Sequence, residues 1–161
     1  MERVGELFAM FPQSVSATDV FAAMTLEAHV TCIGAGQLES CELDVFDRLS
    51  LEGKWLFLPK LVGKPGFDRG VRPFQDFKYL INRRNRLVHM RPSDRLISVT
   101  GGERIDDFLN GQLIQAQGAV DTAEAMVKSL ATRLGSDLPL WAQGDQPTYY
   151  ALRPSDTGSA A

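Results

Sequence analysis

Apolar residues recur every three to four positions along most of the chain, which is the spacing of an amphipathic α-helix. The clearest case is the stretch from Phe74 to Pro92, because Pro73 suits the first helical position and Pro92 prevents continuation. Its predicted apolar stripe consists of Phe74, Phe77, Leu80, Ile81, Arg84 and Val88. Arg84 cannot lose its charge, so we expect it to meet a polar cleft, an acid or a second subunit.

A second helix is predicted from about Thr18 to Gly34. Thr18 or Ser16 can cap its start, and Gly34 and Gly36 can end it. Its predicted buried stripe consists of Val20, Phe21, Met24, Ala28 and Cys32.

A third helix is predicted from Leu51 to about Leu61, with Ser50 as its cap and Pro59 as a kink or end. Its apolar cluster is Trp55, Leu56, Leu58 and Leu61. Lys54 is expected to lie at the surface, with its stem along the protein.

The last long helix is predicted from about Ile105 to Leu134, with Gly135 as its stop. A break is possible near Asn110 and Gly111. Its predicted apolar face is Leu113, Ile114, Ala116, Val120, Ala123, Met126, Val127, Leu130 and Leu134.

The remaining segments are shorter. Residues 1–16 contain a short apolar segment broken by Pro12, and residues 37–49 form an acidic segment that suits a short helix. Residues 62–73 form a basic loop, and residues 95–100 form an extended connection too isolated for a sheet. We therefore predict an all-α, single-domain helical bundle of four to five helices, with a short extended connection and an irregular C-terminal tail.

Composition agrees with one globular domain. The chain has 161 residues, of which 44% are hydrophobic and 23% are charged, and no apolar run is long enough to span a membrane. We expect residues 1–152 to form the domain, residues 153–161 to form a disordered tail, and the protein to be cytoplasmic. Two cysteines make no disulfide framework. His29 and Cys32 offer half of a metal site, but ordinary packing is the simpler reading, so no metal and no cofactor are predicted.

Charge is distributed unevenly. The net charge is −3, yet residues 60–95 hold ten Lys or Arg against three Asp, so this segment is +7 and the rest of the chain is −10. A basic segment on an acidic protein directs a phosphate-bearing ligand to one face, although a solvated helix face explains the same pattern. The predicted RNA-binding residues are Lys78, Arg83, Arg86 and Arg91.

The end of the helix predicted from Phe74 to Pro92 carries the candidate chemistry. The sequence there is Arg84-Asn85-Arg86-Leu87-Val88-His89. An Arg followed by a polar residue, with His five positions after the Arg, resembles the motif of the HEPN superfamily. The resemblance covers about residues 17–134. It implies an all-α bundle, usually a homodimer, whose catalytic members cleave RNA without metal at a cleft formed by both copies of the motif; other members are noncatalytic.

RNA cleavage by a 2′-hydroxyl needs proton transfers and stabilisation of charge on the phosphate. Histidine suits the transfers, so His89 is the predicted acid or base, and Arg84 offers a donor fork to the phosphate. Asn85 is predicted to orient His89 or the phosphate. We therefore expect a metal-independent endoribonuclease with a composite dimer site, such as a toxin or defence effector with a separate antitoxin or regulatory protein.

The alternative is a noncatalytic helical interaction or RNA-binding module. In that case Arg84 pairs with an acid of residues 39–47, and His89 lies at a helix C-terminus because the helix dipole favours it there.

Overall fold

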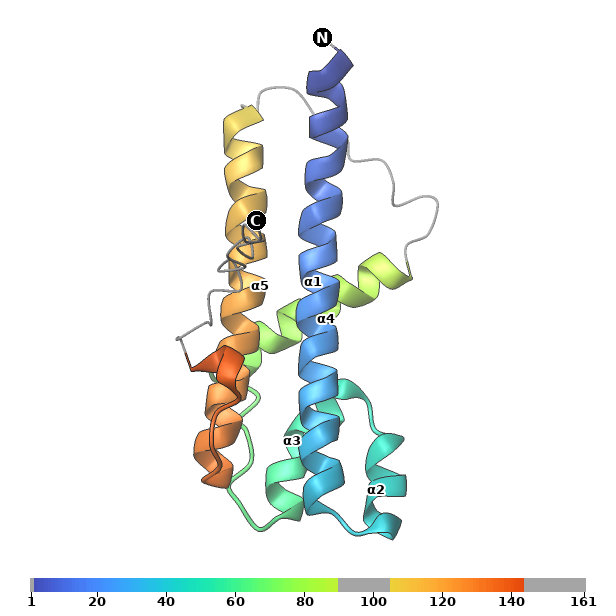
Figure 1. Ribbon diagram of the computed structural model, residues 1–161, viewed down its shortest axis with the longest axis vertical. Helices are drawn as coiled ribbons and strands as arrows, with labels where there is room; N and C mark the ends of the chain where they lie inside the picture. The colour runs from blue at the N-terminus through green and yellow to red at the C-terminus, as the bar shows by residue number, and fades with distance from the viewer. Residues whose placement is uncertain (1, 90–104, 144–161) are drawn as a thin grey trace, which may run out of the picture.

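The computed structural model describes residues 2–89 and 105–143 of the chain (Figure 1). The described residues form five α-helices and one short 3-10 helix, without a strand. In chain order these are α1 (Glu2–Gln37), α2 (Ser40–Asp47), α3 (Leu51–Leu61), α4 (Phe74–Val88), α5 (Ile105–Leu134) and η2 (Leu140–Ala142). The predicted all-α bundle is confirmed. The expected extended connection at residues 95–100 and the tail at residues 153–161 lie outside the described residues.

Two long helices form the frame of the bundle. α1 and α5 lie side by side along the long axis, and α4 crosses and contacts both of them (Figure 1). α2 and α3 pack near the C-terminal end of α1 (Figure 1). The C-terminal end of α4 continues past α1 on the side away from α5 (Figure 1). The first half of α4 is therefore held by the bundle, and its last turns project from it.

Aromatic side chains hold α3 and the start of α4 against the bundle. Trp55 is fully buried, and its ring centroid lies 5.9 Å from that of Phe67 and 5.8 Å from that of Phe77. Phe74 and Phe77 are in edge contact, with centroids 5.3 Å apart. Such pairs contribute about 0.5 to 1.5 kcal/mol each beyond the area they bury. The predicted start of α4 and the core role of Trp55 are confirmed.

The predicted first helix was too short. α1 begins at Glu2, passes through Pro12 and ends at Gln37, so neither the proline nor Gly34 and Gly36 interrupt it. A proline inside a helix costs about 3 kcal/mol or more in local terms. The packing of α1 against α5 is the most extensive helix contact of the bundle, and most helical stability in proteins comes from such tertiary packing.

The predicted buried stripe of this helix was also wrong. Phe21 is 65% exposed and Met24 is 52% exposed, and Ala28 and Cys32 are exposed as well. The buried residues are instead Val15, Asp19, Ala22, Ala23, Leu26 and Val30. α1 thus carries two apolar faces. The small residues Ala22 and Ala23 let the other helices approach the buried face closely.

Lys54 was expected at the surface but is buried, with 6% of its surface exposed. Its ammonium donates to the Thr31 hydroxyl at 3.2 Å and to the Asp47 carboxylate at 3.4 Å. It also lies 5.6 Å from the ring centroid of Phe46. Burial of this charge is tolerated because two other helices supply its partners, and the contact links α1, α2 and α3.

Two further helix expectations need correction. α5 is continuous through Asn110 and Gly111, and it ends as predicted, with Gly135 at a positive φ of 69°. Of its predicted apolar face, Leu113, Ile114 and Val120 are exposed by 54%, 73% and 49% respectively.

In α3, Pro59 lies inside the helix and is buried, whereas Leu61 at the helix end is 49% exposed. No helix in the described ranges has the length and apolar character needed to cross a bilayer.

Candidate active site at the end of α4

The predicted catalytic residues lie on the projecting end of α4. Phe74, Phe77 and Leu80 are fully buried, but beyond them the same stripe emerges from the core, and Val88 is 54% exposed. His89 is exposed and is the C-cap of the helix, where its backbone N–H donates to the Asn85 carbonyl at 2.9 Å. The end of the apolar stripe and the candidate histidine are therefore both open to solvent in one copy of the chain.

Arg84 is half-buried, and its Nη1 donates to the side-chain oxygen of Asn85 at 3.1 Å. Asn85 thus holds the guanidinium in place in this structure. Asp47, from the acidic segment suggested as a partner for Arg84, bonds to Lys54 instead. Within the described ranges Arg84 forms no ion pair, and its side-chain hydrogen bond there is the one to Asn85.

The neighbouring Arg83, rather than Arg84, joins the helices through a buried acid. Its Nε and Nη2 atoms donate to the two carboxylate oxygens of Asp19 at 3.0 and 2.9 Å, and Asp19 has no exposed surface. The Gln115 amide also donates to Asp19, at 2.9 Å. This cluster ties α1, α4 and α5 together directly beside the candidate site. The phosphate contact expected of Arg83 stays a prediction, with two of its donors already engaged.

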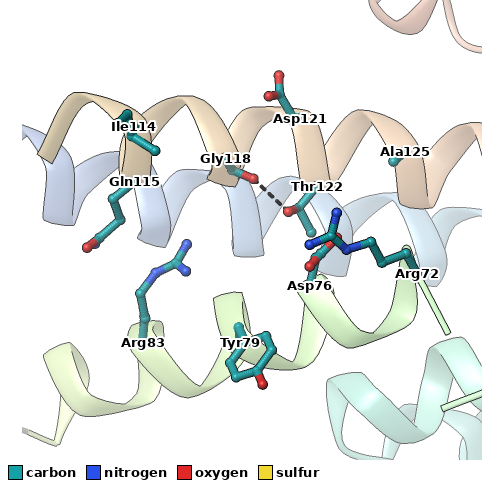
Figure 2. A pocket seen from close by; sticks show the side chains of 10 residues that line it. All are labelled: Arg72, Asp76, Tyr79, Arg83, Ile114, Gln115, Gly118, Asp121, Thr122 and Ala125. Carbon is teal, nitrogen blue, oxygen red and sulfur yellow. Dashed lines mark hydrogen bonds and ion pairs between the residues drawn. The ribbon is translucent and has the colours of Figure 1, made fainter. Parts of the chain in front are cut away.

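A polar cleft of about 480 Å³ lies between α4 and α5 (Figure 2). Tyr79 and Arg83 line it from α4, and Gln115, Asp121 and Thr122 line it from α5 (Figure 2). Sequence patterns did not reveal this cleft, because its two walls lie more than 30 residues apart. One signal was present, since Asp19 is the single charged residue between Gln13 and Leu26 and so needs a partner if that segment is buried.

Of the other predicted RNA-binding residues, Arg86 lies near the projecting end and Lys78 lies in the first half of α4. Lys78 is half-buried and Arg86 is exposed, while Arg91 lies outside the described residues. No acidic residue occurs from Phe77 to His89, so the charged side chains of this part of α4 are all cationic. Its outer surface is suited to a polyanion.

His29 and Cys32, considered as half of a metal site, do not converge on one in the structure. The His29 ring stacks on Trp55 with centroids 6.3 Å apart, and burial lowers the pKa of His29 below its usual 6.5. Cys32 is exposed. In the described part of the chain, no group of three or more His, Cys, Asp or Glu side chains is placed to hold a metal ion.

No protein-family model, curated protein or solved structure matches this chain. The geometry of the end of α4 and the chemistry of its side chains are therefore the basis for any function.

Proposed function

We propose that this protein is a metal-independent endoribonuclease of the HEPN type, with an active site formed by the α4 ends of two copies. The observation that carries the proposal is the projection of the last turns of α4 beyond the bundle (Figure 1). Those turns expose His89 and the apolar surface of Val88, and they carry Arg84, which forms no ion pair within the described ranges. A second copy packed on this end would cover the apolar surface and complete the site.

The reaction begins with removal of a proton from the 2′-hydroxyl of a ribose. The 2′-oxygen then attacks the adjacent phosphorus, the bond from phosphorus to the 5′-oxygen breaks, and the departing 5′-oxygen takes up a proton. The products are a 2′,3′-cyclic phosphate and a 5′-hydroxyl. His89 transfers the protons, and Arg84 donates to the phosphate oxygens as their negative charge increases. Asn85 positions the Arg84 guanidinium, consistent with their 3.1 Å hydrogen bond.

Two copies are needed for geometric reasons. The proton is removed on one side of the phosphate and delivered on the other, so a single imidazole is poorly placed for both transfers. Five residues at about 100° each also put Arg84 and His89 roughly 140° apart around α4. Two α4 ends facing each other supply one histidine for each side and one or two guanidinium groups between them.

The test is cleavage of labelled single-stranded RNA in excess EDTA by wild type, Arg84→Ala and His89→Ala. We expect each substitution to reduce the rate by about 10² to 10⁴-fold. Arg48→Ala, a change of an exposed arginine on the C-cap of α2, is the matched control and should cut normally. A folded His89→Ala protein that cuts at the wild-type rate would refute the catalytic role.

Mixing the two inactive variants tests the composite site. Arg84→Ala and His89→Ala subunits that exchange should regain part of the activity, because some mixed dimers carry one intact set of groups. Val88→Glu should prevent dimer formation in light scattering and abolish cleavage, since it places a charge on the proposed contact. A dimeric Val88→Glu protein with full activity would place the contact elsewhere.

A second candidate is a noncatalytic helical association module, and the outer face of α1 favours it. Residues on this face follow alternating spacings of four and three, the repeat of a coiled-coil seam. They are Ala17, Phe21, Met24 and Ala28, and the exposed face ends before Thr31, whose hydroxyl accepts from Lys54 of α3. Between Gln13 and Gln37 the one exposed ionisable carboxylate is Glu27. This face therefore suits the seam of another helix.

The two candidates predict different dimers. Phe21 lies about 200° around α1 from Asp19, whose carboxylate bonds to α4, so the seam faces away from α4. A dimer through the seam would keep the two α4 ends apart. If the dimer forms through the seam, the Phe21→Glu protein should be monomeric and the Val88→Glu protein should be dimeric. The proposed ribonuclease predicts the reverse.

A further inference from the structure

We propose that the cleft between α4 and α5 binds a nucleobase of single-stranded RNA, with the ring of Tyr79 as its stacking surface. The inference rests on the proposed function, because it takes RNA to lie along α4 on its way to His89. The cleft volume of about 480 Å³ is within the range of about 300 to 1,000 Å³ that is usual for small-ligand sites.

The charges of the cleft do not suit a phosphate. The guanidinium of Arg83 is neutralised by Asp19, with contacts of 3.0 and 2.9 Å. At the mouth, Nε of Arg72 lies 3.3 Å from the Asp76 carboxylate. Asp121 adds no charge inside the cleft, because its side chain points away from α4 and its carboxylate accepts from the Gln117 amide at 2.8 Å (Figure 2). A neutral, flat ligand is therefore favoured inside the cleft, and phosphates are favoured outside it.

The α5 wall presents hydrogen-bond acceptors. Thr122 donates its hydroxyl proton to the Gly118 carbonyl at 2.6 Å, which leaves its oxygen as an acceptor (Figure 2). Gln115 donates to Asp19 through its amide nitrogen, which leaves its amide oxygen as an acceptor. Such a wall favours a ligand with several N–H donors, which the exocyclic amino groups of adenine, cytosine and guanine provide. Uracil has no amino group and offers a single N–H, at N3, so it should bind less well.

Tyr79 supplies the aromatic surface on the opposite wall. It is 66% exposed and lies on the α4 rim of the cleft (Figure 2). Arg86 is seven residues further along the same helix face, roughly 10 Å away, and His89 is roughly 15 Å away. A base held at Tyr79 would place the following phosphates on Arg86 and direct the strand toward the end of α4. Stacking and a cationic path are the usual combination for single-stranded nucleic acid.

The experiment measures binding of labelled ten-nucleotide RNAs to the full chain carrying His89→Ala, which prevents cleavage. Tyr79→Ala should weaken binding of A, C and G oligomers by roughly 5- to 150-fold, the range that stacking on one aromatic ring supplies. Tyr79→Phe and Tyr79→Trp should bind within about twofold of the parent, because they keep the ring. Phe57→Ala removes another exposed aromatic ring, on α3, and should have no effect. Thr122→Val removes an acceptor of the α5 wall and should reduce the advantage of amino-bearing bases over uracil.

An abasic oligomer of the same length separates stacking from a general structural effect. It should bind the parent and Tyr79→Ala equally, as should a duplex RNA of the same sequence. Equal weakening of normal and abasic oligomers would overturn the inference, and so would undiminished binding by Tyr79→Ala. The absence of any RNA binding would overturn it as well.

Failure of this inference is distinguishable from failure of the proposed function. Cleavage that needs His89 but not Tyr79 refutes the base cleft alone. Tyr79-dependent binding to a wild-type protein that never cuts RNA refutes the nuclease and supports the base cleft.

Discussion

Replacing Arg83 should destabilise the fold, because Arg83 is the cationic partner of a fully buried carboxylate. Asp19 has no exposed surface, and its side chain accepts two bonds from Arg83 and one from Gln115. Breaking a buried ion pair by removing one partner costs about 3 to 5 kcal/mol. The Arg83 side chain is 32% exposed and Gln115 remains in place, so water can reach part of the vacancy. We therefore expect Arg83→Ala to lose about 2 to 4 kcal/mol of unfolding free energy.

The assay is chemical and thermal unfolding of Arg83→Ala beside Arg86→Ala, a neighbouring exposed arginine on the same helix. For a chain of this size about 1 kcal/mol corresponds to about 2 to 4 °C, so the melting temperature of Arg83→Ala should fall by roughly 4 to 16 °C. Arg86→Ala should change the free energy by less than about 0.5 kcal/mol. Asp19→Asn should cost less than Arg83→Ala, because the arginine it leaves unpaired can reach solvent.

A double-mutant cycle isolates the pair itself. Asp19→Asn combined with Arg83→Ala should be less destabilising than the sum of the single changes, with a coupling of about 1 to 3 kcal/mol. Additive effects, or an Arg83→Ala protein as stable as wild type, would refute the assigned role of the pair in joining α1, α4 and α5.

Three further expectations follow from single contacts. Gly34→Ala should destabilise the fold by about 1 to 3 kcal/mol in urea unfolding, because the new Cβ would lie 2.6 Å from the Phe46 ring; wild-type stability would contradict this. Burial lowers the pKa of His29, so the contribution of His29 to stability is present above its unfolded pKa of 6.5 and declines as the pH falls below that value. The melting temperature of His29→Gln should therefore fall less steeply with acid than that of wild type. Identical slopes for the two proteins would contradict the assignment. RNA binding should weaken with salt, and Arg86→Ala should flatten that salt dependence by roughly one phosphate contact, whereas Arg48→Ala should not change it. Equal salt slopes for the two variants would show that Arg86 does not contact the RNA.

The sequence by itself determined the features that depend on neighbours in the chain. A helix from Phe74 to Pro92 was predicted from flanking prolines and a 3.6-residue stripe, and α4 spans Phe74–Val88 within the described residues. Ser50 was predicted as a cap, and its hydroxyl accepts from the Gly53 N–H at 3.1 Å. The stop at Gly135 is likewise local, because its positive φ is one that glycine adopts without strain. The all-α class follows from several such signals together.

Tertiary structure decided which of two apolar faces is covered. Periodicity shows that a face is apolar, but only the helices packed against it determine burial. The predicted stripe of the first helix therefore proved to be its exposed face, with Phe21 and Met24 outside.

The same limit applies to charges. Arg84 was expected to be the arginine in need of a partner because it continues the apolar stripe of α4. The last turns of α4 extend past α1, however, so Arg84 lies at the edge of the bundle. Arg83 instead reaches Asp19, which is 64 residues away in sequence. Lys54 is buried because Thr31 and Asp47 approach it from other helices. A buried charge depends on partners brought from distant segments, and no local pattern contains that information.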